Sequence, residues 1–144
     1  VASLLVSVVG DLVAHGAQHL LVPNIPDLGM TPAELGNADA TQYSQWFNSQ
    51  LSSGLASLQA DIELFDTFST LQQLAPTFAN ATSGCIGLPA GCAGYLFFDD
   101  KHPTTAAQQI LADRMYAQLT AVPLPAGVWL FGSALTLLLV RRRG

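Results

Sequence analysis

An aspartate and a histidine three residues apart, Asp99 and His102, occur in the stretch FFDDKHPT at residues 97–104. A histidine that acts as a general base needs a partner for its second ring nitrogen, because that hydrogen bond fixes the tautomer and stabilises the imidazolium. A carboxylate three residues upstream on a turn can fold back to provide it. The spacing therefore predicts His102 as a base and Asp99 as its orienting acid, with Asp100 as the second candidate for that acid. The alternative is an ordinary surface histidine near the start of a helix.

Other polar residues carry weaker signals. His15 and His19 are four residues apart, a spacing that could seat a metal on one helix, but Gly16 is expected to break the helix between them. We therefore predict no metal site and no cofactor. Asn24 and Asp27 lie at the end of a predicted strand, where ligands bind in open α/β sheets, and we regard them as candidate substrate contacts. Pro-Asn and Pro-Asp are also ordinary turn formers, so a purely structural role stays open.

The two cysteines, Cys85 and Cys92, lie in a loop rich in glycine, proline and alanine, SGCIGLPAGCAG. Two thiols alone make a poor metal site. We predict a loop-closing disulfide, which would place the domain in an oxidising compartment; free buried thiols are the alternative.

Three stretches have the apolar spacing of amphipathic helices: residues 4–13, 43–58 and 107–119. Gly16 ends the first in the manner of a C-cap, and Asp39 with Gln42 is placed like a capping pair for the second. The third is expected to begin at Thr104 or Thr105, with Gln118 or Leu119 completing its apolar face. The aromatic residues of the second helix are interpreted as core and helix surface rather than as an acyl groove: Tyr43, Trp46 and Phe47.

Two apolar runs, HLLVPNI at 19–25 and DIELFDTF at 61–68, predict buried strands, and residues 69–79 predict a short helix interrupted near Pro76. Helices that alternate with strands lacking a wet face are typical of a parallel sheet covered on both sides. The sequence therefore predicts the α/β class. Because only two strands are recognised, we expect the chain, which starts at Val1, to be the C-terminal part of a longer protein that supplies the others.

The charge distribution argues against a nucleic-acid partner. The formal charge of the whole chain is −5, but residues 1–140 carry ten acidic residues against only Lys101 and Arg114, which gives −8. Binding to phosphates needs clustered lysine and arginine, and the body of this chain has the opposite sign. We therefore expect no nucleic acid among the partners.

The last 23 residues, VPLPAGVWLFGSALTLLLVRRRG, have a different character. Residues 122–140 are uncharged and as a helix would span about 28 Å, close to the hydrocarbon core of a bilayer at about 30 Å. The terminal basic residues Arg141, Arg142 and Arg143 would stay in the cytoplasm. We predict a transmembrane helix; a buried core helix is the alternative, but it fits poorly with three arginines directly after it.

This tail resembles the VPLPA variant of the PEP-CTERM sorting signals, in which a short proline-containing motif precedes an apolar helix and a basic end. The matching motif is Val122, Pro123, Leu124, Pro125 and Ala126. The resemblance implies an exported protein of a Gram-negative bacterium, held in the inner membrane with its domain in the periplasm. An exosortase-like enzyme would then process it to the cell surface or outside. The expected boundaries are a domain over residues 1–120 and the sorting signal over 121–144.

The run GYLFFDDKHPTTAAQQILADRM, together with HLLVPNIPDLGMTP and IELFDTF upstream, resembles the C-terminal part of the SGNH (GDSL) lipase/esterase family, in its lecithinase/haemolysin-like branch. The likeness covers about residues 1–120. It implies a flavodoxin-like α/β/α domain, an ester or acyl-lipid substrate, and a Ser-His-Asp triad to which this chain contributes His102 and Asp99.

The serine of that family stands in a Gly-Asp-Ser block, and no such block occurs here. Gly10-Asp11-Leu12 has a leucine in the serine position and lies in a helical pattern. We therefore expect the nucleophile and the oxyanion-binding Gly and Asn outside this chain, and we expect these residues alone to be inactive. The alternative function is a non-catalytic, surface-anchored binding or matrix protein that keeps the fold and the sorting tail.

Overall fold

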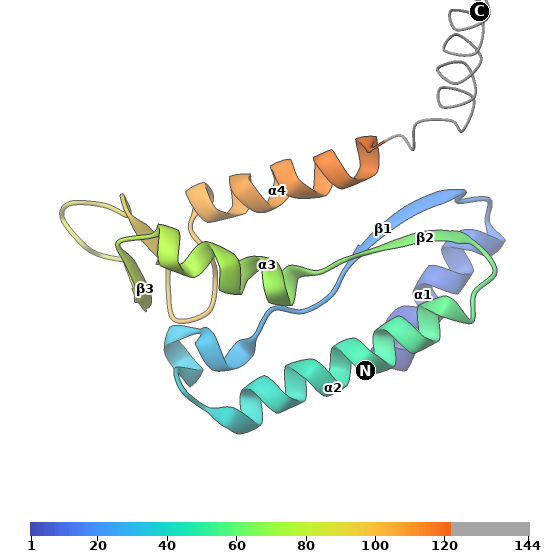
Figure 1. Cartoon of the computed structure of the whole chain (residues 1–144), viewed down its shortest axis with the longest axis horizontal. Helices are drawn as coiled ribbons and strands as arrows, with labels where there is room; N and C mark the ends of the chain where they lie inside the picture. The colour runs from blue at the N-terminus through green and yellow to red at the C-terminus, as the bar shows by residue number, and fades with distance from the viewer. Residues whose placement is uncertain (122–144) are drawn as a thin grey trace, which may run out of the picture.

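The computed structural model describes residues 1–121 (Figure 1). Its helices are α1 (Ala2–Ala14), α2 (Ala38–Ala56), α3 (Thr67–Leu74) and α4 (Thr105–Thr120), with 3-10 turns η1 (Leu28–Met30), η2 (Pro32–Glu34) and η3 (Ala75–Thr77). Its strands are β1 (His19–Pro23), β2 (Asp61–Phe65), β3 (Asn80–Gly84) and β4 (Tyr95–Phe97). This alternation confirms the α/β class and the three long helices predicted from apolar spacing.

Strands β1 and β2 pair in parallel, from His19 opposite Asp61 to Pro23 opposite Phe65. Figure 1 shows these strands between α4 on one side and α1 with α2 on the other. A parallel pair needs apolar cover on both faces, and two clusters provide it. One contains residues of α1, β1 and α2: Ala2, Val9, Val22, Phe47, Leu51 and Leu55. The other joins β2, α3, β4 and α4: Phe65, Leu71, Leu74, Leu96, Phe97, Ala107 and Leu111.

The helix ends follow local capping chemistry. Helix α1 stops at Ala14, and Gly16 takes a φ of 99°, as expected for a residue that turns the chain away from a helix. The predicted cap of α2 by Asp39 and Gln42 is wrong. Asn37 caps that helix instead, since its side-chain oxygen accepts hydrogen bonds from the N–H groups of Asp39 and Ala40.

Strands β3 and β4 were not predicted. They pair in parallel with an irregular register, from Asn80 opposite Tyr95 to Gly84 opposite Phe97. The sequence of β3, NATSG, has no apolar run or alternation, so local pattern gives no strand signal. The sequence predicted only two strands, whereas residues 1–121 contain four, in two separate two-stranded sheets.

Near its C-terminal end, α4 makes a hydrogen bond to β2. Gln118, not Leu119, points to the strand, because its side-chain amide donates to the backbone oxygen of Leu64 at 3.3 Å, whereas Leu119 is exposed. Within the described part of the chain, no helix combines the length and hydropathy needed to cross a bilayer. The predicted membrane helix at 122–140 and the sorting motif lie outside the described residues.

Candidate active site

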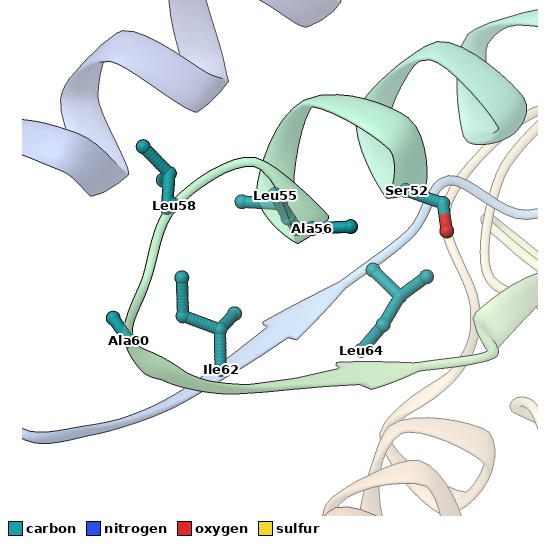
Figure 2. A pocket seen from close by; sticks show the side chains of 7 residues that line it. All are labelled: Ser52, Leu55, Ala56, Leu58, Ala60, Ile62 and Leu64. Carbon is teal, nitrogen blue, oxygen red and sulfur yellow. The ribbon is translucent and has the colours of Figure 1, made fainter.

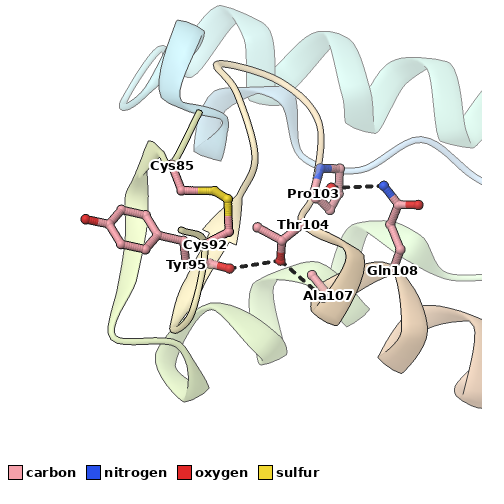
Figure 3. The surroundings of a disulfide bond; sticks show 7 residues. All are labelled: Cys85, Cys92, Tyr95, Pro103, Thr104, Ala107 and Gln108. Atoms are coloured by element: carbon pink, nitrogen blue, oxygen red, sulfur yellow. Dashed lines mark hydrogen bonds between the residues drawn. A yellow bond between two sulfur atoms is a disulfide. The ribbon is translucent and has the colours of Figure 1, made fainter. Parts of the chain in front are cut away.

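The Asp99 and His102 pair lies on a tight turn between β4 and α4. At the base of the turn, the Phe98 N–H donates to the His102 carbonyl at 2.7 Å, and Phe97 forms a β-bridge with Pro103. Thr104 then fastens the turn to β4, because its hydroxyl donates to the carbonyl of Tyr95 at 2.9 Å (Figure 3). The same hydroxyl accepts from the N–H of Ala107 and caps α4. Strand and helix therefore fix both ends of the turn.

Within the turn, the carboxylate of Asp99 binds His102 at two points. Oδ1 accepts from the backbone N–H groups of Lys101 at 2.8 Å and His102 at 2.7 Å. Oδ2 lies 2.8 Å from Nδ1 of the imidazole. When Nδ1 carries the proton and donates to Oδ2, Nε2 has a free lone pair that can accept a proton. The histidine side chain is 72% exposed and that of Asp99 28%, so the ring is accessible from solvent.

The same contacts keep Asp99 ionised. The backbone N–H of His102 has the largest effect, followed by its side chain and by the N–H of Lys101, and together they lower the pKa of Asp99 from 3.8 to about 2. A carboxylate charged throughout the neutral range can stabilise an imidazolium. Asp100, the second candidate for this role, is not hydrogen-bonded to the histidine in the described structure; its backbone carbonyl accepts from the N–H of Ala33 at 2.9 Å. That bond joins the turn to the loop that follows β1.

The loop before β4 supports the turn from the other side. Cys85 and Cys92 form the predicted disulfide, with a Cα–Cα distance of 5.1 Å (Figure 3). Gly84, just before the bridge, lies directly against the backbone of Asp99, and a Cβ placed on it would come within 2.6 Å of the Asp99 carbonyl oxygen. Sequence reasoning missed Gly84, since nothing local indicates a contact with a residue fifteen positions away.

The two residues proposed as substrate contacts make structural hydrogen bonds. Asn24 joins the end of β1 to the start of α3, since it accepts from the Phe68 N–H at 3.0 Å and donates to Asp66 at 3.1 Å. Asp27 is buried, with a relative exposure of 6%. Its two carboxylate oxygens accept hydrogen bonds from Gly29, Thr41 and Gln72. These contacts explain both residues structurally, and their role with substrate stays a prediction.

The carboxylate of Asp66, which caps α3, was not singled out from the sequence. Burial raises its pKa, but hydrogen bonds from Ser69, Asn24 and Phe68 act in the opposite direction. Their sum leaves the pKa of Asp66 below its ordinary value of 3.8. This charge lies at the carboxyl end of β2, and its contacts are those of a helix cap.

The remaining histidines lie apart from the turn. His15 contacts the backbone oxygen of Asp11 at 2.7 Å, and His19 contacts the carboxylate of Asp61 at 2.6 Å. In residues 1–121 no three side chains of metal-binding type come together. Among the aromatic residues of α2, Phe47 is buried, while Tyr43 and Trp46 are exposed with ring centroids 6.1 Å apart.

A hollow of about 240 Å³ lies between the end of α2 and β2, as Figure 2 shows. Its lining is apolar apart from Ser52 and includes Leu55, Ile62 and Leu64. The hollow lies near the start of β2, whereas the turn with His102 contacts the loop after β1, at the opposite end of the sheet. It contains no acid, base or nucleophile suited to the chemistry of the turn beyond one serine hydroxyl.

Comparison with known proteins identifies relatives of this chain. The family model of GDSL-like lipase/acylhydrolases matches residues 2–115. A protein of Pseudomonas putida described as an uncharacterized protein in the trpE-trpG intergenic region is 32% identical over 132 residues, covering 74% of this chain and 22% of its own. Esterase EstA of Pseudomonas aeruginosa is 29% identical over 130 residues, covering 73% and 20%. Esterase EstA of Pseudomonas putida matches equally well. The chain spans about a fifth of the length of these curated relatives.

Proposed function

The chain belongs to the GDSL-like lipase/acylhydrolase family, and on that premise we propose that it is the C-terminal part of a serine ester hydrolase whose base is His102 and whose orienting acid is Asp99. The observation that carries the proposal is the hydrogen bond from the imidazole Nδ1 to Asp99 at 2.8 Å, on a turn that leaves the ring exposed. The esterases among its relatives support an ester substrate, of which acyl lipids are one class.

The nucleophile in this proposal is a serine outside residues 1–144. Gly10, Asp11 and Leu12 lie inside α1, so the superficially similar segment supplies neither a hydroxyl nor a turn. The serine hydroxyl would attack the ester carbonyl while Nε2 of His102 takes its proton, and the same nitrogen would then protonate the departing alkoxide. A water molecule then attacks the acyl-enzyme in the same way: Nε2 of His102 takes a proton from the water and returns it to the departing serine oxygen. The charge of Asp99 stabilises the imidazolium in both steps.

The test is ester hydrolysis by the longer protein, expressed from the coding sequence that includes the region upstream of Val1. His102→Ala should lower kcat/KM by about a thousandfold or more without loss of folding, because the ring is exposed and contributes little to the core. Asp99→Asn should also be severe, while Asp100→Asn serves as the matched control and should be mild. Wild-type turnover in His102→Ala would refute the assignment, and a reversed order of the two aspartates would make Asp100 the orienting acid. A longer protein that hydrolyses no ester would favour the binding-protein alternative.

We also propose that the protein is exported and held in the inner membrane through residues 122–140, with its domain in the periplasm. The support is the sequence of the tail: nineteen uncharged residues followed by Arg141, Arg142 and Arg143. The disulfide between Cys85 and Cys92 agrees with an oxidising compartment. An exosortase-like enzyme acting near Val122–Ala126 would then release the domain to the surface or outside.

A further inference from the structure

We propose that Ile86 and Phe98 form an apolar wall beside His102 that contacts the acyl chain of the ester, so that the substrate class is esters of medium or longer acyl chains rather than acetyl esters. The inference rests on the proposed function, because it assigns the chain-length preference of that same site.

The three residues are joined in one row by backbone hydrogen bonds. The N–H of Ile86 donates to the carbonyl of Phe98 at 2.7 Å, and the N–H of Phe98 donates to the carbonyl of His102, also at 2.7 Å. Each is therefore the direct backbone neighbour of the next. Ile86 is 62% exposed and Phe98 44%, although both are large and apolar. The imidazole at the end of the row is exposed as well.

The neighbouring residues prevent the apolar side chains of Ile86 and Phe98 from turning into the core. Cys85, next to Ile86, is buried at 1% exposure and bonded to Cys92, and its N–H donates to the same Phe98 carbonyl at 2.9 Å. Phe97, next to Phe98, already fills the core at 0% exposure. Successive residues of an extended segment point to opposite sides, so burial of Phe97 directs Phe98 outward. The disulfide and the core thus hold the wall in place beside the base.

The chemistry of the surroundings favours an uncharged, apolar group. Two acids and one base, Asp99, Asp100 and Lys101, follow Phe98 directly, and residues 1–121 as a whole hold ten acidic side chains against Lys101 and Arg114, a formal charge of −8. Anionic groups would be repelled from such a surface. An acyl chain would instead bury apolar area against the wall, and each methylene removed from water strengthens binding by about fourfold. An acetyl group has no methylene to bury there.

The experiment compares two water-soluble esters, p-nitrophenyl acetate and p-nitrophenyl octanoate, both below the concentration at which octanoate aggregates. The longer protein is assayed as wild type, Ile86→Ser, Phe98→Ser and the matched control Tyr116→Ser, which removes a 69% exposed aromatic residue in the C-terminal half of α4. We expect wild type to prefer octanoate. The ratio of kcat/KM for octanoate to that for acetate should fall at least tenfold in each wall variant, and Tyr116→Ser should match wild type.

The outcomes separate this inference from the function on which it rests. If His102→Ala abolishes hydrolysis of both esters but the wall variants keep the wild-type ratio, the wall assignment is wrong and the hydrolase assignment stands. An equal loss for both esters in Phe98→Ser, or a wild-type preference for acetate, would also overturn the wall. If His102→Ala leaves hydrolysis intact, or wild type hydrolyses neither ester, the proposed function fails and the wall fails with it. Circular dichroism and thermal unfolding of each variant check that it folds.

Discussion

Replacing Gly84 by alanine should move the turn that carries His102 without removing any group from it. The Cβ would lie 2.6 Å from the Asp99 carbonyl oxygen and 2.7 Å from the carbonyl carbon, while ordinary van der Waals contact begins near 3.4 Å. The turn must therefore retreat from β3 by about 0.8 Å. A displacement of about 1 Å at a reacting group can cost about a hundredfold in rate, so we expect kcat/KM of the longer protein to fall by tens to a hundredfold.

The same change should destabilise the fold, because the atoms that meet the new methyl group are backbone atoms and cannot rotate away. Overpacking of this kind costs about 1–3 kcal/mol, measurable by urea unfolding. Gly10→Ala is the matched control: it lies inside α1, its new Cβ would be 3.5 Å from a Leu58 methyl group, and alanine should stabilise the helix by about 0.5–1 kcal/mol.

One further measurement separates displacement of the turn from its loss. The hydrogen bonds from Lys101 and His102 to Asp99 lie within the turn and should move with it, so the pKa of Asp99 should stay at about 2 in Gly84→Ala. A carbon-13 titration of the carboxyl group reports that value, and kcat should fall more than KM rises. Wild-type turnover in Gly84→Ala would refute the packing argument, whereas a pKa that returns to 3.8 would show that the turn has come apart.

The remaining predictions concern acid, the disulfide and the tail. Because folding lowers the pKa of Asp99 from 3.8 to about 2, its contribution to stability is present above about pH 4 and is lost as pH falls toward 2; Asp99→Asn should flatten that part of the urea-midpoint profile. Reduction of Cys85–Cys92 should cost about 2 kcal/mol, since the closed loop is short, and a fully alkylatable pair in exported protein would refute the bridge. Deleting residues 122–144 should release the domain from membranes, and changing Arg141–Arg143 to glutamate should impair orientation and processing, because each arginine costs about 2.5 kcal/mol or more to move through the bilayer. A deleted form that still sediments with membranes would overturn the anchor, and an intact tail on mature surface protein would overturn the processing step.

The sequence predicts best the features that depend on neighbours along the chain. Helices α1, α2 and α4 follow from apolar spacing, and the contact between Asp99 and His102 follows from a three-residue separation on a turn. Strand β3 was missed because its five small and polar residues are held by pairing with β4 and not by any pattern of their own. The predicted cap of α2 was two residues too late in the chain, because Asn37 and Asp39 are both residue types that commonly cap helices. Only the structure shows that the Asn37 side chain accepts the hydrogen bonds from the first backbone N–H groups.

The other features that the sequence did not predict depend on contacts between residues far apart in the chain. The close approach of Gly84 to Asp99 and the bond between Asn24 and Asp66 join segments that are far apart in the sequence. A single sequence offers no spacing from which to infer them. The disulfide could be predicted from the sequence, because its two cysteines are close in sequence and are the two that the chain has.

The bridge between Cys85 and Cys92 also determines which of the two loops around it tolerates insertions and deletions. The residues between the two cysteines enter and leave through points held 5.1 Å apart at the Cα atoms, so their number could grow or shrink while the base of the loop keeps its shape. The turn from Asp99 to His102 has no such freedom, because an added residue would change the three-residue spacing that brings the backbone N–H and the imidazole of His102 to the Asp99 carboxylate. Natural variation in length should therefore accumulate between Cys85 and Cys92 and be absent between Asp99 and His102. Substrate preference could then drift among relatives while the proposed catalytic pair, Asp99 and His102, keeps its geometry.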